Sequence, residues 1–206
     1  MPFISSAGRR FAKTKQTVAP GPTPGTQLLL NSGFTDFNAS TGAATSWSAS
    51  PGWQAFSPSY SASRPCTVTN MPSYAGVYPT SSSTGFVIFS YVSATISQTI
   101  NITSLTGINT ITGVLNIANT NNRSLGDTFT FQIQYKNAAG TVLYTSTTNS
   151  TTAPAAWTDY TLTLTRASSP NFDLIKSATV NITGIDSGFW NGQFGPAMDY
   201  CTLTLT

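Results

Sequence analysis

The stretch Gly188-Phe-Trp-Asn-Gly-Gln-Phe-Gly-Pro-Ala-Met-Asp-Tyr-Cys-Thr-Leu-Thr-Leu-Thr206 indicates the fold class. In its second half, apolar residues at 201, 203 and 205 alternate with threonines at 202, 204 and 206. A period of two predicts a β-strand with one buried face and one solvent-facing side. The glycine-rich first half, which carries Phe189 and Trp190, predicts a loop that leads into this strand.

The same alternation recurs along the body of the chain. It is clearest at Phe129, Phe131, Ile133 and Tyr135, and it returns in the segments 94–102 and 160–165. Gly113 interrupts a further strand over 108–117 and predicts a β-bulge there. Helical periodicity is limited to one turn near Phe172. About nine or ten strands in this arrangement predict an all-β fold, a two-sheet antiparallel β-sandwich of the jelly-roll type.

The composition argues against catalysis. Ser and Thr together make up 61 of the 206 residues, whereas charged residues make up 7%. The chain has no His and no Glu, so it lacks the commonest general base and the commonest metal ligand. No nucleophile motif or phosphate-binding loop occurs either. We therefore predict that the protein is not an enzyme and has no catalytic residues.

The basic charge is concentrated at the N-terminal end. The first fifteen residues carry four bases and no acid, and the remainder carries five bases and six acids. Prolines at 20, 22 and 24 predict an extended spacer, so we divide the chain into a basic Pro/Gly-rich arm, 1–26, and one jelly-roll domain, 27–206. Four bases are too few to predict nucleic-acid binding. We expect the arm to dock on neighbouring subunits through Phe3, Ile4, Arg9, Arg10, Phe11, Lys13 and Lys15.

Membrane and redox signals are weak. No apolar run has the length of a membrane span, and no hydrophobic region of a Sec-type leader follows the start. Cys66 and Cys201 allow either one disulfide or two buried thiols, and their spacing matches no zinc motif.

Several short motifs resemble the galactose-binding-like β-sandwich, the jelly roll of many carbohydrate-binding modules. They are Leu29-Leu-Asn-Ser-Gly-Phe34 with Trp53, Ile96-Ser-Gln-Thr-Ile-Asn-Ile102, Trp157-Thr-Asp-Tyr-Thr-Leu162 and Gly195-Pro-Ala-Met-Asp-Tyr-Cys-Thr-Leu203. The resemblance implies the fold over most of the chain. It also implies that a structural calcium could lie near Asp199. The alternative is that Asp199 fixes a turn by accepting hydrogen bonds from loop amides, and otherwise we expect no metal and no cofactor.

Loop aromatics are the candidates for sugar binding. Phe189, Trp190, Tyr74 and Tyr78 could stack on the apolar face of a sugar ring. The alternative for each of these residues is packing within the core or the long loops.

A basic tip, a Pro/Gly spacer and a hydroxyl-rich jelly roll resemble minor structural proteins of large icosahedral DNA viruses, including algal viruses. This resemblance implies a non-enzymatic minor capsid protein, located in the virion, whose arm contacts other capsid proteins. The alternative is a secreted carbohydrate-binding or host-adhesion module that uses loop aromatics.

Overall fold

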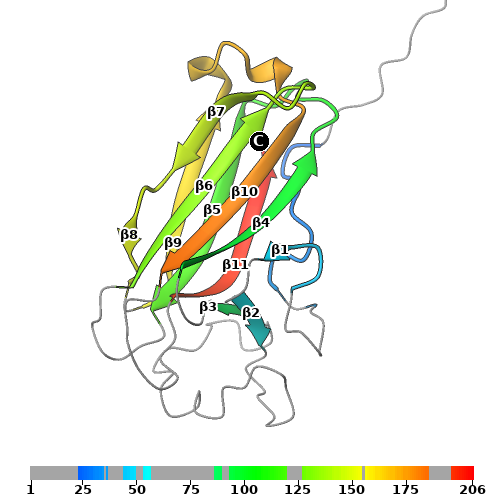
Figure 1. The fold of residues 1–206 in the computed structure, drawn as a ribbon. Coiled ribbons are helices and arrows are strands. Elements are labelled where there is room, and N and C mark those ends of the chain that lie inside the picture. Colours follow the sequence, from blue (N-terminus) through cyan, green and yellow to red (C-terminus); the bar gives the residue numbers. More distant parts are fainter. Residues whose placement is uncertain are drawn as a thin grey trace, which may run out of the picture.

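The computed structural model describes residues 23–34, 36, 44–49, 53–56, 86–89, 93–119, 127–154, 156–185 and 196–206, except for the side chains of 53–56, 86–89 and 119. Figure 1 shows two layers of strands. The strands are β1 (Ser48–Ala49), β2 (Trp53–Phe56), β3 (Phe86–Phe89), β4 (Ser93–Asn101), β5 (Thr110–Asn119), β6 (Thr128–Lys136), β7 (Val142–Thr147), β8 (Thr151–Thr152), β9 (Thr158–Thr165), β10 (Ser177–Ile185) and β11 (Pro196–Leu205). Two single 3-10 turns, η1 (Arg166–Ser168) and η2 (Phe172–Leu174), follow β9.

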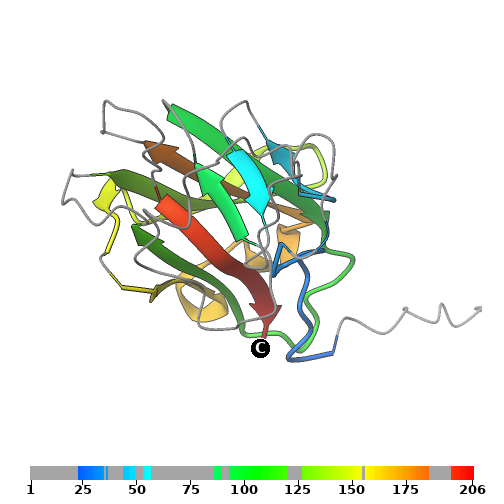
Figure 2. The ribbon, with the colours of Figure 1, turned by 90° about the horizontal axis from the view of Figure 1, so that it is seen from below.

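The strands form two antiparallel sheets. One has the order β1-β4-β10-β6-β7, with β8 also paired to β6, and the other has the order β2-β3-β11-β5-β9. Figure 2 shows β11, in red, beside the shorter β3. The predicted all-β, two-sheet antiparallel sandwich is therefore confirmed, and η2 lies where one helical turn was expected. In the described part of the chain, no helix has the length and hydropathy of a membrane span.

The core lies between the two sheets and is built from the alternating residues. Phe129, Phe131 and Ile133 of β6 and Leu203 and Leu205 of β11 are almost completely buried. Each such side chain removed from water stabilises the fold by about 1.5–3 kcal/mol. Cys201 is a free, buried thiol in this core, and burial raises its pKa. Cys66 lies outside the described residues.

The bulge lies on a different strand from the one predicted. Gly113 keeps its register with Leu203 on one side and Leu162 on the other, so β5 runs through without interruption. The register shifts instead in β11, between Met198 and Tyr200. Gly113 serves close packing, because an added Cβ would overlap Ile133 Cδ1 and lie 3.2 Å from Phe131 Cζ.

We expect Gly113→Ala to lower the free energy of unfolding by about 1–3 kcal/mol, because overfilling a packed core forces neighbouring side chains to shift. Urea denaturation measures this change, with Thr112→Ala as the control on the outer face of the same strand. If Gly113→Ala is as stable as wild type or more stable, Ile133 and Phe131 can move aside without loss of stability, and the prediction is wrong.

The segment 25–32 covers the edge of β11 (Figure 1, blue). Leu28 N–H donates to Leu203 O at 2.8 Å, and Cys201 N–H donates to Ser32 O at 2.8 Å. The β-pairing of this segment consists of a single bridge between Gln27 and Thr204. Gly25, within the predicted arm, also donates its N–H to Leu205 O, so the segment attached to the sandwich includes Gly25.

A buried glutamine holds this segment from the opposite sheet. Gln98 of β4 accepts a hydrogen bond from Leu30 N–H at 2.8 Å through Oε1. Its Nε2 donates to Leu30 O and Ser46 O, each at 3.0 Å. Gln98 is only 6% exposed, so these three bonds replace the water that its amide would otherwise bind.

Gln98→Ala should lower the free energy of unfolding by about 2–4 kcal/mol, because it removes three hydrogen bonds and leaves backbone groups without their partners. Gln134→Ala, on the outer face of β6, is the matched control and should change stability by less than about 0.5 kcal/mol. Chemical denaturation of both variants tests this, and similar losses in the two would contradict it.

Candidate functional site

The two sheets present outer faces of different chemistry. On the six-stranded sheet, threonine hydroxyls are bonded to one another across strands: Thr95 to Thr183 at 2.7 Å, and Thr99 to Thr179 at 3.0 Å. Lys136 Nζ also donates to Thr179 Oγ1 at 3.3 Å. These hydroxyls are already engaged within the protein, which leaves fewer of them for a ligand.

The outer face of the five-stranded sheet presents rows of threonines. The outward residues of β9, β5 and β11 lie opposite one another in rows: Thr161, Val114 and Thr202 form one row, and Thr163, Thr112 and Thr204 form the next. The hydroxyls of Thr161, Thr163 and Thr202 make no hydrogen bond with any described residue. Thr161 and Thr163 are exposed and Thr202 is half-buried, so this face can be contacted from outside.

The bulge in β11 places a tyrosine on this face. Met198 lies opposite Ile117, whose side chain points into the core, and Tyr200 lies opposite the outward residue Asn116. In a regular strand without this register shift, alternation from Met198 through Asp199 would turn Tyr200 inward and Cys201 outward. The bulge therefore lets Met198 and Cys201 both enter the core while Tyr200 faces out.

Tyr200 is bonded to an aspartate on the far side of β5. Tyr200 OH donates to Asp159 Oδ1 at 2.6 Å. Tyr200 and Asp159 both lie opposite Asn116, so their Cα atoms are separated by two strand spacings, roughly 9.6 Å. The tyrosine side chain must therefore extend across β5, over Asn116, to reach the carboxylate. Tyr200 is half-buried, so part of this side chain remains exposed to solvent.

Asn116 lies beneath this contact and is only 7% exposed. Its Nδ2 donates to Asp159 Oδ1 at 2.7 Å, so one carboxylate oxygen accepts from both neighbours. Asn116 Oδ1 is buried and accepts no hydrogen bond from the part of the protein that is described. The row Tyr200, Asn116 and Asp159 thus combines a fixed aromatic ring, a carboxylate and an amide.

The surroundings keep Tyr200 protonated. Partial burial, the hydrogen bond to Asp159 and the negative charges of Asp159 and Asp199 together raise the pKa of Tyr200 to about 12. Each cause disfavours the phenolate, whose charge would be poorly hydrated and repelled by the two carboxylates. The hydroxyl therefore remains a hydrogen-bond donor throughout the physiological pH range.

This shift predicts a stability loss in alkaline solution. The folded-state pKa of Tyr200 exceeds the unfolded value near 10, so its contribution is complete below pH ~10 and is lost as pH rises through about 12. Urea denaturation between pH 8 and pH 11 should show the free energy of unfolding falling above pH ~10, and less steeply in Tyr200→Phe. Tyr135, whose pKa burial also raises, is present in both proteins, so the difference reports on Tyr200. Identical slopes would contradict the prediction.

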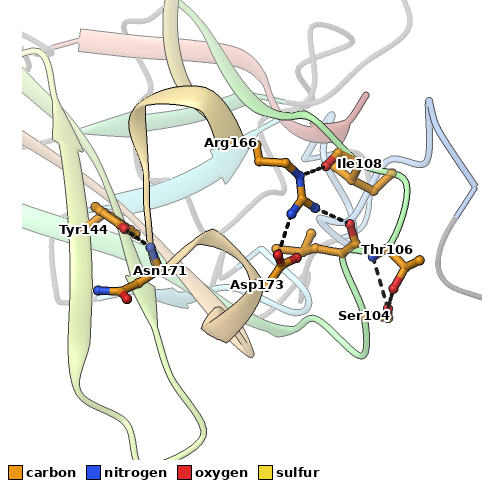
Figure 3. A network of polar contacts seen from close by, with 8 residues as sticks. Ser104, Thr106, Ile108, Tyr144, Arg166, Asn171 and Asp173 are labelled. Atoms are coloured by element: carbon orange, nitrogen blue, oxygen red, sulfur yellow. Dashed lines mark hydrogen bonds and ion pairs between the residues drawn. The ribbon is translucent and has the colours of Figure 1, made fainter.

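A second polar cluster, at the end of the sandwich that carries η1 and η2, is structural (Figure 3). Arg166 donates to Ile108 O at 2.9 Å and Leu105 O at 2.8 Å, and it pairs with Asp173 at 2.6 Å. Its guanidinium also lies 4.8 Å from the centroid of the Phe172 ring. These contacts connect the loop 102–109 to the 3-10 turns. They also use the N–H donors of Arg166 that an anionic ligand would need.

Most of the site residues predicted from the sequence lie outside the described residues. This applies to the docking residues Phe3, Ile4, Arg9, Arg10, Phe11, Lys13 and Lys15, and to the sugar-stacking candidates Phe189, Trp190, Tyr74 and Tyr78. Both sets stay predictions.

Asp199 lies at the bulge and is 1% exposed. Within the described ranges, no three His, Cys, Asp or Glu side chains gather to hold a metal ion. The calcium site near this residue stays a prediction. The negative charge of Asp199 also contributes to the raised pKa of Tyr200.

Tyr200, Asn116 and Asp159 are not among the site residues predicted from the sequence. Two of them stand in quoted motifs, Trp157-Thr-Asp-Tyr and Ala197-Met-Asp-Tyr200, and Asn116 is a polar interruption in the apolar run Val114-Leu-Asn-Ile117. A polar residue in an otherwise apolar strand was the available signal, but only the strand register brings the three together.

Comparisons with known proteins find structures with a similar fold. No protein-family model matches the sequence, and a comparison with curated proteins finds no match. A cyclase from Fischerella sp. TAU is similar with a TM-score of 0.53 and 12% identity, over 88% of this chain and 97% of the cyclase. The enzymatically active domain of tailspike protein 4 from bacteriophage CBA120 is similar with a TM-score of 0.50 and 14% identity, over 87% of this chain.

This chain spans 21% of that tailspike chain. The xylan-binding domain CBM22-1 from Paenibacillus barcinonensis is similar with a TM-score of 0.47 and 11% identity, over 89% of this chain and 97% of the domain. Identities this low show a shared β-sandwich fold alone. The comparisons give no support to the virion and capsid interpretation.

Proposed function

We propose that this protein is a non-enzymatic carbohydrate-binding β-sandwich that binds a sugar on the outer face of its five-stranded sheet. The observation that carries this proposal is the Tyr200 side chain, which crosses β5 and is fixed there by the 2.6 Å bond to Asp159. A sugar would stack one ring face on the tyrosine. This replaces the loop aromatics with a residue of the sheet as the main contact.

The neighbouring groups supply what a sugar requires besides an aromatic face. A sugar presents hydroxyl donors on its edges and C–H groups on its faces, so it needs polar acceptors beside an apolar surface. The Asp159 carboxylate offers acceptor positions beyond those used by Tyr200 and Asn116. Because Tyr200 is already held in place, binding would cost little additional side-chain entropy.

The absence of His and Glu from the sequence supports a binding role rather than a catalytic one. Asp159 also accepts two hydrogen bonds on the same oxygen, from Tyr200 OH and Asn116 Nδ2, so its position is fixed by the protein.

The proposal predicts that Tyr200→Ala weakens glycan binding by at least about tenfold, which corresponds to a loss of about 1.4 kcal/mol. A microarray of neutral oligosaccharides would identify the ligand, and calorimetry would give the affinities. Tyr200→Phe should fall between wild type and Tyr200→Ala, because it keeps the ring but loses the bond to Asp159.

Thr130→Ala is the control, because Thr130 faces outward on β6 of the opposite sheet. It should bind the same glycan with unchanged affinity, and thermal unfolding should show that all variants fold. If no neutral glycan binds, or if Tyr200→Ala binds as tightly as wild type, the proposed function is wrong.

A further inference from the structure

The edges of the two sheets differ in how well they are protected against pairing with another chain. β1 and β2, each at one end of a sheet, have two and four residues, and β7 has a register shift against β6. β9 is the last strand of the five-stranded sheet, has eight residues and pairs with β5 without a shift. It contains no lysine and no proline, which are the residues that commonly block an exposed edge. Within the described part of the protein, β9 is therefore the longest regular edge.

The pairing of β9 with β5 determines which backbone groups of β9 point to its free edge. Arg166 N–H donates to Asn109 O at 2.8 Å, and antiparallel strands exchange backbone hydrogen bonds at every second residue pair. The next bonded residues of β9 are therefore Leu164, Leu162 and Tyr160. The N–H and C=O groups of the residues between them point away from β5, and these residues are Asp159, Thr161, Thr163 and Thr165.

Three of these four residues have unpaired backbone groups on the free edge. Thr165 O already accepts a hydrogen bond from Ser168 Oγ at 3.2 Å. The backbone groups of Asp159, Thr161 and Thr163 make no hydrogen bond on that side to any described residue, and all three residues are exposed. The available positions are thus symmetric about Thr161, because Asp159 lies two residues before it and Thr163 two residues after it.

We infer that β9 pairs antiparallel with β9 of a second copy of this chain, with the two-fold axis at Thr161. In this register Thr161 lies opposite Thr161 of the partner subunit, and Asp159 lies opposite Thr163 of the partner subunit. All three available residues then exchange both backbone bonds, which gives about six hydrogen bonds across the interface. The two five-stranded sheets join into one continuous sheet.

Charge favours a second copy as the partner. Asp159 is the only charged residue of β9, and in this register it faces a neutral threonine. The Cα atoms of the two Asp159 residues are then roughly 14 Å apart, which exceeds the screening length of about 8 Å at physiological ionic strength. Outside the first fifteen residues, the chain has five bases and six acids, a net charge of −1, so the two sandwiches repel each other little.

The number of hydrogen bonds predicts the strength of the dimer. Interfaces carry about one hydrogen bond per 100–200 Å², so this one buries roughly 600–1,200 Å², the size of a weak interface. Dimerisation should therefore depend on protein concentration. The axis is perpendicular to the joined sheet, so the Tyr200 rows of both copies lie on the same side of it. The dimer itself does not depend on the proposed function.

Sedimentation equilibrium of the full chain tests the dimer between about 1 μM and about 1 mM, the range expected for so small an interface. Wild type should change from monomer to dimer within this range. Thr161→Pro should weaken dimerisation by about tenfold or more, because it removes a donor from each side of the interface and breaks no internal hydrogen bond. Thr161→Lys, which places two positive charges at the axis, should weaken it as well.

Thr145→Pro is the matched control at the edge of the other sheet. Thr148 N–H donates to Phe131 O at 2.9 Å, so by the same alternation Thr145 N–H points away from β6. This variant should dimerise like wild type, and circular dichroism should show that the variants fold. If Thr161→Pro does not fold, Thr161→Lys decides. A wild-type protein that stays monomeric up to about 1 mM would overturn the inference, and so would a folded Thr161 variant that dimerises like wild type.

A cysteine crosslink tests the register. In a Cys66→Ser background, Thr161→Cys places two thiols on residues whose Cα atoms are about 5.5 Å apart, within the span of a disulfide. Thr163→Cys places them on residues roughly 14 Å apart, which a disulfide cannot span. Under oxidation, Thr161→Cys should form a covalent dimer and Thr163→Cys should not. Equal crosslinking of the two variants would overturn the pairing about Thr161.

Discussion

The register shift at Asp199 is the constraint on which the rest of the structure depends. Strict alternation allows a strand to bury either the residues around Met198 or the set Cys201, Leu203 and Leu205, but not both on the same side. The register shift reverses which residues after Met198 face inward, so both sets enter the core. The same change turns Tyr200 outward, so one local irregularity completes the core and creates the candidate site.

This arrangement requires β11 to be held on both edges. On one side it pairs with β5 over almost its whole length, but β3 covers only Ala197 and Met198 on the other. The segment 25–32 supplies the missing bonds, and Gln98 anchors that segment from the second sheet. An uncovered edge would offer unpaired backbone groups to other chains. The early part of the sequence therefore stabilises the last strand and, through it, the position of Tyr200.

The fold could be predicted because its signal is local. Alternation in β6 and β9 follows directly from which side chains are buried, and the structure shows the same residues facing the core. The bulge could not be placed from the sequence. Pro196, Ala197, Met198 and Asp199 are all buried, so this run does not alternate and does not indicate which of its residues face the core. Gly113 looked like the irregular position but serves packing against Ile133. The site forms only because β9 and β11 both pair with β5. This pairing brings Asp159 to Asn116, which is 43 residues earlier in the sequence, and Tyr200 to Asp159, which is 41 residues earlier.

The high content of serine and threonine serves two different purposes on the two sheets. On the six-stranded sheet, cross-strand pairs such as Thr95 and Thr183 satisfy each other and stabilise the sheet internally. On the five-stranded sheet, Thr204 donates to Thr112 O at 3.4 Å and Thr165 is hydrogen-bonded to Ser168 at 2.7 Å, but no pairs of described threonines bridge the strands. Tyr200 and Asn116 instead donate to Asp159. Composition alone treats these two faces as one neutral surface. What distinguishes the five-stranded face is the hydrogen bond from Tyr200 to Asp159, which fixes an aromatic ring across β5 beside a carboxylate.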